Sequence, residues 1–358
     1  MQVQRPPAEL LYADELARLA KKDKHPRPPG WRLSLPAVRT FIMGDDKLKV
    51  RRKFVGNPSL VDRAMVTLAT ERGLMLVGEP GTAKSLLSEL LAAAISGRST
   101  LTIQGGASIT EDQIKYSWNY ALLVAEGPSP RALVPAPVYE AMREGMLVRF
   151  EEITRCPLEV QDSLLSVMSD RVLAVPELAG KDGMVFAAEG FNLIATANTR
   201  DRGVNEMSAA LKRRFNFETV FPIPDFDTEL ALVREESSRL LERSGVPKAC
   251  PDDVLDLLVT TFRELRSGVT VEGQAMERLS TVMSTAEAVA VAHAVGVRGW
   301  YTRGEPGNPA DLVECLAGTA AKDDAEDLKR LRTYLEQRVR RRGEAHWKAF
   351  YEARHRLG

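Results

Sequence analysis

A glycine-containing turn followed by a lysine and a serine is the stretch of this sequence best suited to chemistry. The turn is Gly78-Glu79-Pro80-Gly81-Thr82-Ala83, and Lys84 and Ser85 follow it directly. The backbone N–H groups of such a turn face phosphate oxygens, the lysine places a positive charge beside the outer phosphates, and the hydroxyl can be a magnesium ligand. We therefore predict that Gly78–Ser85 is the phosphate-binding loop of a nucleoside triphosphatase.

One position of this loop differs from the usual pattern G-x-x-x-x-G-K-[ST]. Ala83 stands where the second glycine is expected. Alanine is the smallest replacement, and it is unfavourable only if the position requires a positive φ angle. The flanks support the prediction, because Leu74–Val77 reads as a short buried strand and the leucines after Ser85 fall at helical spacing.

Two adjacent acids, Glu151 and Glu152, end a second apolar run, Met146–Phe150. If that run is a strand, its end presents both carboxylates to a metal ion and to the attacking water. Glu151 would then hold Mg²⁺ directly or through water, and Glu152 would polarise the nucleophilic water. The first acid is usually Asp. Because glutamate is one methylene longer, Glu151 must fold back or act through water, which leaves the metal geometry and the turnover rate open.

A further polar residue, Asn198, ends a third apolar run, Phe191–Ala197. Its amide could orient the attacking water or contact the terminal phosphate. The short helix predicted over 208–215 ends in three cations, and cations at a helix C-terminus are electrostatically favourable in any helix. A strand over 217–221 would then complete the sheet.

The remaining elements position these residues. A helix from Lys84 to about Ser96, with Gly97 as its C-cap, a strand over 101–104 and a helix over 157–169 complete an α/β pattern. Residues 105–140 are irregular and read as an insertion or functional loop, and residues 170–191 read as a β-hairpin. From Pro224 onward the pattern is almost entirely helical, with helices expected over about 225–244, 251–267, 272–295, 309–321 and 323–342.

The segment before the phosphate loop predicts a peripheral helix between Glu9 and Lys24, then a strand over 31–35 and a short helix after Pro36. A helix over about 59–70 would be capped by Ser59. A segment just upstream of a phosphate loop often lies over the nucleotide base, so Phe54, Val55 and Gly56 are candidates for that contact. The alternative is that they are ordinary core residues.

The composition narrows the class of protein. Of the 358 residues 44% are hydrophobic, and 49 basic residues balance 49 acidic ones, so a global field that attracts nucleic acid is not indicated. The three cysteines are widely spaced and indicate neither a disulfide framework nor a metal site. Neither a signal-peptide core nor an apolar run long enough to span a membrane is found. The expected location is therefore cytoplasmic.

In this order the motifs resemble those of AAA+ ATPases, and within them the MoxR type. GEPGTAKS is similar to the phosphate loop of that type, including its alanine. The acid-pair strand and the helix after it are matched by RFEEITRCPLEVQDSLLSVMSDR, the first sensor strand by FNLIATANTRD, and the arginine-finger helix by SAALKRRFNF. The resemblance covers about residues 50–265.

The resemblance implies an α/β fold, namely a P-loop AAA+ core with a parallel sheet sandwiched by helices, followed by an all-helical lid. We expect four segments, and the Pro222/Pro224 pair marks the boundary between the core and the lid. They are an N-terminal helical extension and linker over 1–45, the nucleotide-binding core over 46–222, the lid over 223–300 and a helical C-terminal extension over 301–358.

Residue by residue, the resemblance implies that Lys84 and Ser85 bind phosphate and Mg²⁺, that Glu151 and Glu152 are the metal and catalytic acids, and that Asn198 is the first sensor. Arg214, directly before Phe215, fits the arginine finger, which acts on nucleotide bound by a neighbouring subunit. The resemblance therefore implies a ring, usually a hexamer.

The family pattern for the second sensor, Ser-Pro-Arg near the start of a lid helix, is not found, and Arg278 is the candidate. The 105–140 insertion and the 170–191 hairpin would face the pore or a partner, with contacts from Trp118, Tyr120 and Arg131.

These implications favour an ATP-hydrolysing, ring-forming chaperone that remodels or assembles a protein client, with ATP and Mg²⁺ as cofactors. The resemblance also implies partners that carry a von Willebrand factor A domain. One alternative is a scaffold that binds ATP with little turnover, motivated by Glu151 and the missing second-sensor pattern. Another is a nucleic-acid motor, against which the zero net charge argues.

Overall fold

The computed structural model describes residues 4–199, 206–280, 283–322 and 324–357. The chain forms two compact units, which are described separately. The first comprises Met1–Gly78 and Ala83–Phe221, and the second comprises Glu79–Thr82 and Pro222–Gly358.

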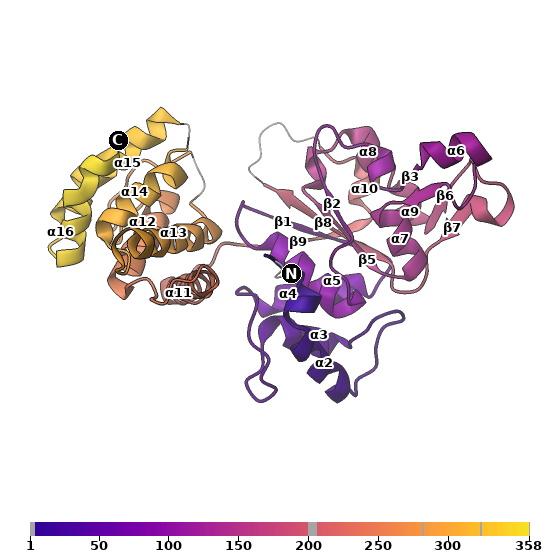
Figure 1. Cartoon of the computed structure of the whole chain (residues 1–358), viewed down its shortest axis with the longest axis horizontal. Helices are drawn as coiled ribbons and strands as arrows, with labels where there is room; N and C mark the ends of the chain where they lie inside the picture. Colours follow the sequence, from indigo (N-terminus) through magenta and orange to yellow (C-terminus); the bar gives the residue numbers. More distant parts are fainter. Residues whose placement is uncertain (1–3, 200–205, 281–282, 323, 358) are drawn as a thin grey trace. The chain divides into compact units, whose positions relative to one another are not determined.

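A five-stranded parallel sheet forms the centre of the first unit (Figure 1), in the order β2-β5-β8-β1-β9. Its strands are β1 Gly73–Gly78, β2 Thr102–Gln104, β5 Leu147–Glu151, β8 Asn192–Asn198 and β9 Phe215–Thr219. The predicted parallel α/β sheet is thus confirmed. The last strand was predicted two residues too late, because Phe215 already pairs with Gly73 at the start of β1.

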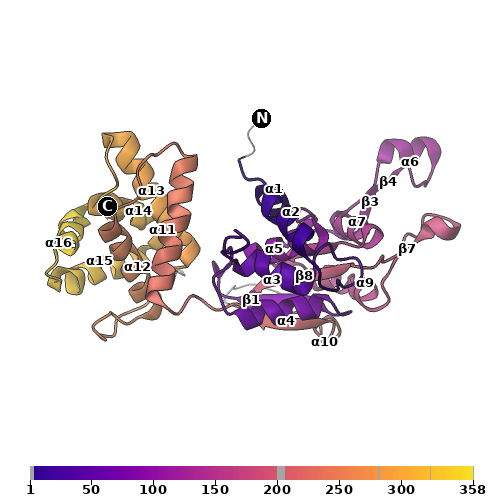
Figure 2. The ribbon, with the colours of Figure 1, turned by 90° about the horizontal axis from the view of Figure 1, so that it is seen from below.

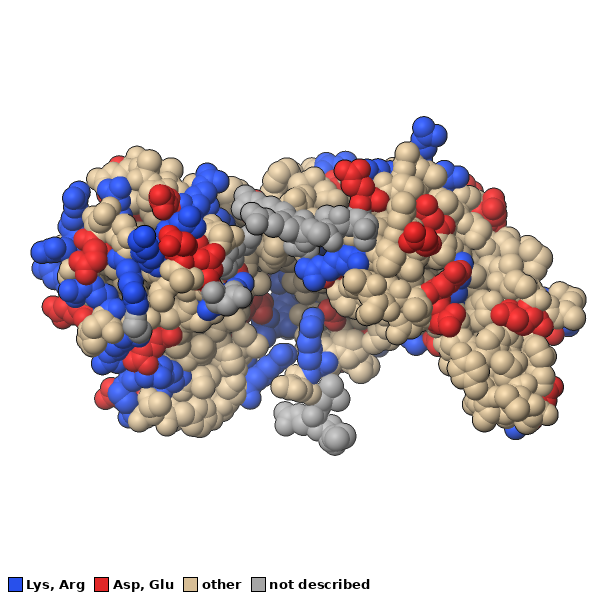
Figure 3. Space-filling model, turned by 90° about the horizontal axis from the view of Figure 1, so that it is seen from above, with Lys and Arg blue, Asp and Glu red and all other residues tan. Residues whose placement is uncertain are grey.

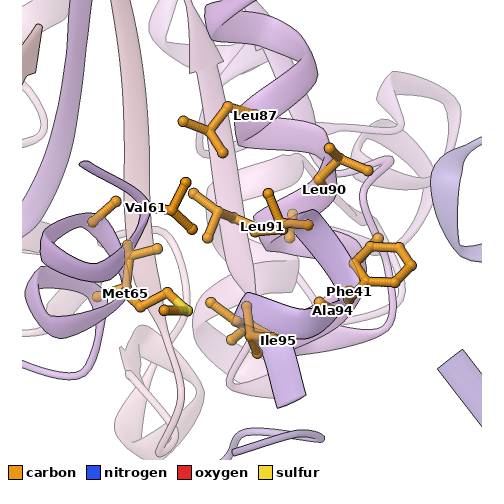
Figure 4. Close-up of a cluster of buried hydrophobic side chains, with 14 of the residues drawn as sticks. Phe41, Val61, Met65, Leu87, Leu90, Leu91, Ala94 and Ile95 are labelled. Carbon is orange, nitrogen blue, oxygen red and sulfur yellow. The ribbon is translucent and has the colours of Figure 1, made fainter. Parts of the chain in front are cut away.

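Helices cover both faces of this sheet. Their bounds are α1 Ala8–Leu11, α2 Ala13–Lys22, α3 Leu35–Met43, α4 Pro58–Leu68, α5 Lys84–Ser96, α7 Pro137–Glu144, α8 Leu158–Asp162, α9 Leu165–Ser169 and α10 Ala209–Lys212. Alternate residues of β1 point to opposite faces, as the two-residue period of a strand requires. Leu74 and Leu76 join the core with α1–α5, part of which Figure 4 shows, whereas Met75 joins the core on the other face.

Three further expectations for the first unit were wrong in detail. Residues 31–34 are not a strand, and Ser34 instead caps α3 by accepting a hydrogen bond from the N–H of Ala37. Asn57, rather than Ser59, caps α4. The helix predicted over 157–169 is two short helices, α8 and α9. Gly97, in contrast, ends α5 with a φ of 71°, as predicted.

Two hairpins extend from the same end of the first unit (Figures 1 and 2). One pairs β3 Tyr116–Trp118 with β4 Leu133–Pro135 and carries α6 Tyr120–Glu126, so the 105–140 segment is more regular than predicted. The other pairs β6 Val172–Ala174 with β7 Met184–Phe186 and confirms the predicted 170–191 hairpin. A small apolar cluster of Leu133, Val175 and Leu178 joins them.

The second unit is helical. Its helices are α11 Phe226–Arg243, α12 Asp252–Ser267, α13 Thr285–Arg303, α14 Pro309–Ala320, α15 Ala325–Gln337 and α16 Ala345–Glu352. The helix expected over 272–295 was wrong, because α13 begins only at Thr285 and a β-bridge joins Val269 to Ala275. Helix α16 lies within the predicted helical extension over 301–358, although no separate helix was expected after residue 342.

One buried apolar cluster spans this whole unit, from Val233 on α11 to Phe350 on α16. The segments 223–300 and 301–358, which we predicted separately, therefore share a core, and a division of roles between them stays a prediction. On the face of this unit shown in Figure 3, basic and acidic side chains are interspersed. Within the described part of the chain, we find no helix that combines the length and the hydropathy needed to cross a bilayer.

Candidate active site

The carboxyl ends of β1, β5 and β8 bring the predicted site residues together. Because the strands are parallel and paired in register, Gly78 lies opposite Asn198, and Phe150, just before the two acids, lies opposite Ala195. Lys84 and Ser85 begin α5, directly after the loop that follows β1. This edge of the sheet thus collects the proposed phosphate loop, the acid pair and the asparagine.

Ala83 adopts a left-handed backbone conformation at the start of α5, with φ 66° and ψ 25°. This is the positive φ for which alanine is unfavourable, at a cost of roughly 1–2 kcal/mol relative to glycine. Lys84 is buried, and its ammonium group lies 3.1 Å from the carbonyl oxygen of Gly78. Within the loop, the hydroxyl of Thr82 donates to the carbonyl of Glu79 at 2.9 Å.

The carboxylate of Glu151 is surrounded by hydrogen-bond donors. Its Oε2 accepts from the hydroxyls of Ser85 at 2.7 Å and Thr196 at 2.9 Å. Its Oε1 accepts from the hydroxyl of Ser88 at 2.7 Å and from Nη2 of Arg149 at 2.9 Å. Burial raises the pKa of Glu151, but these hydrogen bonds and the charge of Arg149 outweigh it, so the pKa lies below its ordinary value. Glu151 is therefore held as an anion.

The donor set fits Mg²⁺, which prefers hard oxygen ligands and usually combines one or two protein groups with phosphate oxygens. Ser85 offers a hydroxyl oxygen whose proton is directed at Glu151. Both Glu151 oxygens already accept two hydrogen bonds each, so Ser85 is the better direct ligand and Glu151 the group that orients it. Among the described residues, His, Cys, Asp and Glu side chains do not gather in groups of three or more that could hold a metal by themselves.

Glu152 also has a left-handed backbone, with φ 54° and ψ 45°. Its backbone N–H donates to the hydroxyl of Thr196 at 2.9 Å. Its carboxylate accepts from Nδ2 of Asn198 at 3.4 Å, from Nε2 of Gln104 at 3.2 Å, and lies 3.1 Å from Nε of Arg155. Gln104 and Arg155 were not among the predicted site residues. Gln104 ends β2 at the same sheet edge. It carries the same signal that pointed to Asn198, namely a polar residue at the end of a strand.

Arg214 lies at the opposite end of the sheet. It precedes β9, and its carbonyl accepts a hydrogen bond from the N–H of Gly73, the first residue of β1. Five steps along β1, at about 3.3 Å per residue, separate that end from the phosphate loop by roughly 16 Å. Its guanidinium donates to the hydroxyl of Ser169 at 2.8 Å and the carbonyl of Ala210 at 3.0 Å. The fold thus does not bring Arg214 to its own subunit's phosphate loop.

The segment proposed to contact the nucleotide base lies against the core of the first unit. Phe54 is buried within the cluster that includes α3 and α4, whereas Val55 and Gly56 are half-buried. A Cβ atom at Gly56 would lie 2.5 Å from the ring of Phe54, so a larger residue there would have to displace that ring. Phe54 therefore has a structural role, and base contact by this segment stays a prediction.

Arg278 lies in the second unit, in the non-helical segment before α13. Its side chain is exposed, and its Nε donates to the carbonyl of Ser267 at 2.7 Å. Its assignment as second sensor rested on a helix start near residue 272, which the structure does not have. At the real start of α13 the residues are Ser284-Thr285-Ala286, where the Ser-Pro-Arg pattern would require an arginine in the third place. The role of Arg278 stays a prediction without that support.

Comparisons with known proteins define the class. A family described as "AAA domain (dynein-related subfamily)" matches residues 73–215, and one described as "YehL-like AAA+ ATPase C-terminal domain" matches residues 227–358. The protein is thus an AAA+ protein, as the motifs predicted. An Escherichia coli (strain K12) relative, "Uncharacterized protein YehL", is 66% identical over 355 residues, covering 99% of this chain and 98% of that protein. The chain therefore belongs to the YehL family.

More distant relatives carry functional names. "Chaperone MoxR1" of Mycobacterium tuberculosis is 26% identical over 220 residues, covering 58% of this chain and 51% of that protein. "Gas vesicle ATPase GvpN2" of Halobacterium salinarum is 25% identical over 348 residues, covering 92% of this chain and 90% of that protein. The crystal structure of NtrX from Brucella abortus in complex with ADP has a TM-score of 0.50 at 14% identity, covering 84% of this chain and 64% of that one. This last likeness shows the fold alone.

Proposed function

We propose that this protein is a Mg²⁺-dependent ATPase that assembles into a ring of identical subunits, usually six in AAA+ proteins, and remodels or assembles a protein client. The observation that carries this proposal is the gathering of Lys84, Ser85, Glu151, Glu152 and Asn198 at one edge of a parallel sheet. The name of the gas vesicle relative supports ATP hydrolysis, and that of MoxR1 supports a chaperone role.

In the proposed mechanism each group acts at a stated place. The N–H groups of the loop and the ammonium of Lys84 bind the phosphates, and Ser85 contributes its hydroxyl to the Mg²⁺ of the nucleotide. When bound, Mg²⁺ would neutralise part of the negative charge of the phosphates. Glu152 accepts a proton from the attacking water, and the amide of Asn198, which already contacts Glu152, holds that water in line.

Arg214 supports assembly into a ring. An arginine finger must reach the phosphates of a bound nucleotide, and the sheet holds Arg214 roughly 16 Å from its own phosphate loop. It can therefore serve only a nucleotide bound by another copy of the chain. A head-to-tail contact of this kind closes into a ring when its rotation closes.

The two hairpins are the proposed client-facing surface. None of the seven described residues of α6 is buried, although its sequence is YALLVAE. Val124 is 87% exposed, Tyr120 71%, and Phe186 on β7 67%. Exposed apolar side chains gathered at one end of a unit mark a protein contact. A client with an apolar surface, including a partner with a von Willebrand factor A domain, suits this end.

A second candidate is a scaffold that binds ATP with little turnover. It is favoured by the absence of an arginine in Ser284-Thr285-Ala286 and by the contacts of Gln104 and Arg155 that restrain the carboxylate of Glu152. The interspersed charges of Figure 3 and the zero net charge give no support to a nucleic-acid motor.

Steady-state ATP hydrolysis against protein concentration tests the proposal. We expect specific activity to rise with concentration in the native chain. It should fall at least 100-fold in Glu152→Gln, whose amide cannot accept the proton. Arg214→Ala should lower turnover by about 10³-fold, the low end for an arginine finger. Arg213→Ala, at the exposed neighbouring arginine, is the matched control and should stay near the native rate.

The possible outcomes separate the two candidates. Tight nucleotide binding without phosphate release at any concentration would favour the scaffold. Loss of activity in Arg213→Ala but not in Arg214→Ala would move the finger to the neighbouring residue. If a fluorescent ATP analogue does not bind the native chain, or binds Lys84→Ala equally well, the proposed site is wrong.

A further inference from the structure

A buried arginine lies beside the acid of the proposed magnesium site. Arg149 is the third residue of β5 and only 8% exposed, and Glu151, two residues later, is 5% exposed. Residues two apart on a strand project from the same face. Both side chains therefore face α5, and both contact its first two turns at Ser85 and Ser88.

The guanidinium of Arg149 is held on all sides. Its Nε donates to the hydroxyl of Ser88 at 2.9 Å, and its Nη1 donates to the carbonyl of Ser99 at 3.0 Å. Its Nη2 donates both to the carbonyl of Ser85 and to Oε1 of Glu151, each at 2.9 Å. The group is thus fixed relative to β5, to α5 and to the turn after α5. This buried guanidinium needs its carboxylate partner, because an unpaired buried charge is strongly destabilising.

These contacts explain how a glutamate fits where an aspartate is usual. The Glu151 side chain is one methylene too long for that place, and Arg149 lies before it on the strand. Attraction to Arg149 and Ser88 therefore draws Oε1 back along β5, away from the strand's end. Oε2 is left to accept from Ser85 and Thr196. The long side chain is folded, and one of its two oxygens stays beside the serine of the phosphate loop.

We propose that Arg149, together with Ser88, is a positioning group that folds Glu151 back so that this glutamate can orient the Ser85 hydroxyl toward the Mg²⁺ of a bound nucleotide. Arg149 touches neither nucleotide nor metal in this role and acts only through Glu151. The inference rests on the proposed function, since it requires that Ser85 meets a Mg²⁺–nucleotide complex.

Nucleotide binding measured with and without Mg²⁺ tests the role. The probe is a fluorescent ADP analogue, titrated first in EDTA and then with increasing MgCl₂. In Arg149→Met we expect the Mg²⁺ concentration for half-maximal tightening to rise at least fivefold, while the affinity in EDTA stays within twofold of native. Arg149→Lys keeps the charge but not the planar fork, so it should raise this Mg²⁺ concentration by a smaller factor. Ser88→Ala removes one contact of Oε1 and should raise it about two- to threefold.

A double variant separates positioning from a merely structural role. Glu151→Asp alone leaves Arg149 without its carboxylate partner and should also require at least threefold more Mg²⁺. In Arg149→Met with Glu151→Asp, the shorter acid needs no folding back. We expect the double variant to return to within twofold of the native Mg²⁺ requirement. A double variant as weak as Arg149→Met, or weaker, would overturn the proposal.

The remaining outcomes separate a failure of this inference from a failure of the proposed function. If Arg149→Met does not fold, as judged by circular dichroism, Ser88→Ala and Glu151→Asp carry the test, and an unchanged Mg²⁺ requirement in both rejects the role. If the native chain tightens on the ADP analogue with Mg²⁺ but Arg149→Met does the same at equal concentration, the inference alone fails. If the native chain does not bind the analogue, or Lys84→Ala binds it equally well, the proposed function fails instead.

Discussion

Two residues with left-handed backbones flank the reacting groups, Ala83 before Lys84 and Glu152 at the end of β5. Each costs roughly 1–2 kcal/mol in a residue other than glycine. Such strain persists where the surrounding structure fixes the conformation, and it is common at active sites. At Glu152 the side chain is needed for the proposed chemistry, whereas at Ala83 the methyl group has no proposed role, so only Ala83 can be relieved by glycine.

We predict that Ala83→Gly stabilises the chain. The variant removes the left-handed strain but gives the unfolded chain more freedom, which offsets about 0.4–1 kcal/mol, so the free energy of unfolding should rise by about 0.5–1 kcal/mol. Urea unfolding measures this. The matched control is Ala17→Gly, in the exposed interior of α2, where glycine should cost about 1 kcal/mol. Equal destabilisation by both substitutions would show that position 83 is not strained.

At the residue scale the sequence predicted the groups that stand at the ends of elements. Lys84 and Ser85 begin a helix, and Glu151 and Asn198 end strands, so local patterns locate them. The residues that hold Glu151 could not be found in this way. Ser88, Arg149 and Thr196 lie inside elements, and they meet only because of the register between β5, β8 and α5, which is a property of the folded chain.

Three helices of the second unit are joined at one buried carboxylate. Glu229 on α11 accepts from Arg263 and Arg266 on α12, with closest distances of 2.9 Å, and from the hydroxyl of Thr285 at the start of α13 at 2.6 Å. Its side chain is 1% exposed. Arg263 also donates to the carbonyl of Pro224, so the same network fixes the segment that enters the unit.

We predict that Glu229→Gln destabilises the second unit by about 3 kcal/mol at pH 7, because it leaves two arginines without their buried partner. Burial raises the pKa of Glu229, but the hydrogen bond and charge of Arg266, with Thr285 and Arg263, hold it below the ordinary 4.5. A carboxylate whose pKa is lower in the folded than in the unfolded chain contributes its full stabilisation above the unfolded-state pKa. This contribution is lost as the pH falls through the folded-state pKa. The difference between native and variant should therefore be largest above about pH 4.5 and shrink below it.

Urea unfolding of the native and variant chains at several pH values measures this difference. Glu277→Gln is the control, since Glu277 pairs with Arg330 at the surface and is 81% exposed, so it should change stability by less than about 0.5 kcal/mol. A constant difference between Glu229→Gln and native across the whole pH range would contradict the linkage.

The element boundaries that the sequence missed had local signals. Ser34 followed by Pro36 is a helix start, with a cap and a proline in the first turn, and it was hidden by the apolar residues around it. Ser284 and Glu287 form a capping box that marks the real start of α13. The helical spacing of apolar residues before Ser284 predicted a longer helix, but the bridge between Val269 and Ala275 takes that stretch out of the helix.

At the scale of the molecule, the sheet separates the two halves of the proposed site. The phosphate loop follows the carboxyl end of β1, and Arg214 lies beside its amino end. One subunit therefore offers the acids at one edge of its sheet and the arginine at the other. In a closed ring each interface would combine Glu152 of one subunit with Arg214 of the next.

We predict from this that two inactive variants restore activity when they are mixed. Glu152→Gln keeps the arginine but not the acid, and Arg214→Ala keeps the acid but not the arginine. At equal amounts, about a quarter of interfaces in randomly assembled closed rings should pair an intact Glu152 with an intact Arg214, and ATP hydrolysis should reach about a quarter of the native rate. Phosphate release after subunit exchange measures this.

The control is a mixture of Glu152→Gln with the double variant that carries both substitutions, in which an intact Glu152 never occurs, so it should stay inactive. If Arg214 acted on nucleotide bound by its own subunit, every site in the first mixture would lack one of the two groups, and mixing would restore nothing. A mixture as inactive as its components, although its subunits exchange, would thus reject the shared site. Recovery of activity would require Glu152 of one subunit to meet Arg214 of another. Within a single subunit the length of β1 keeps these two residues apart.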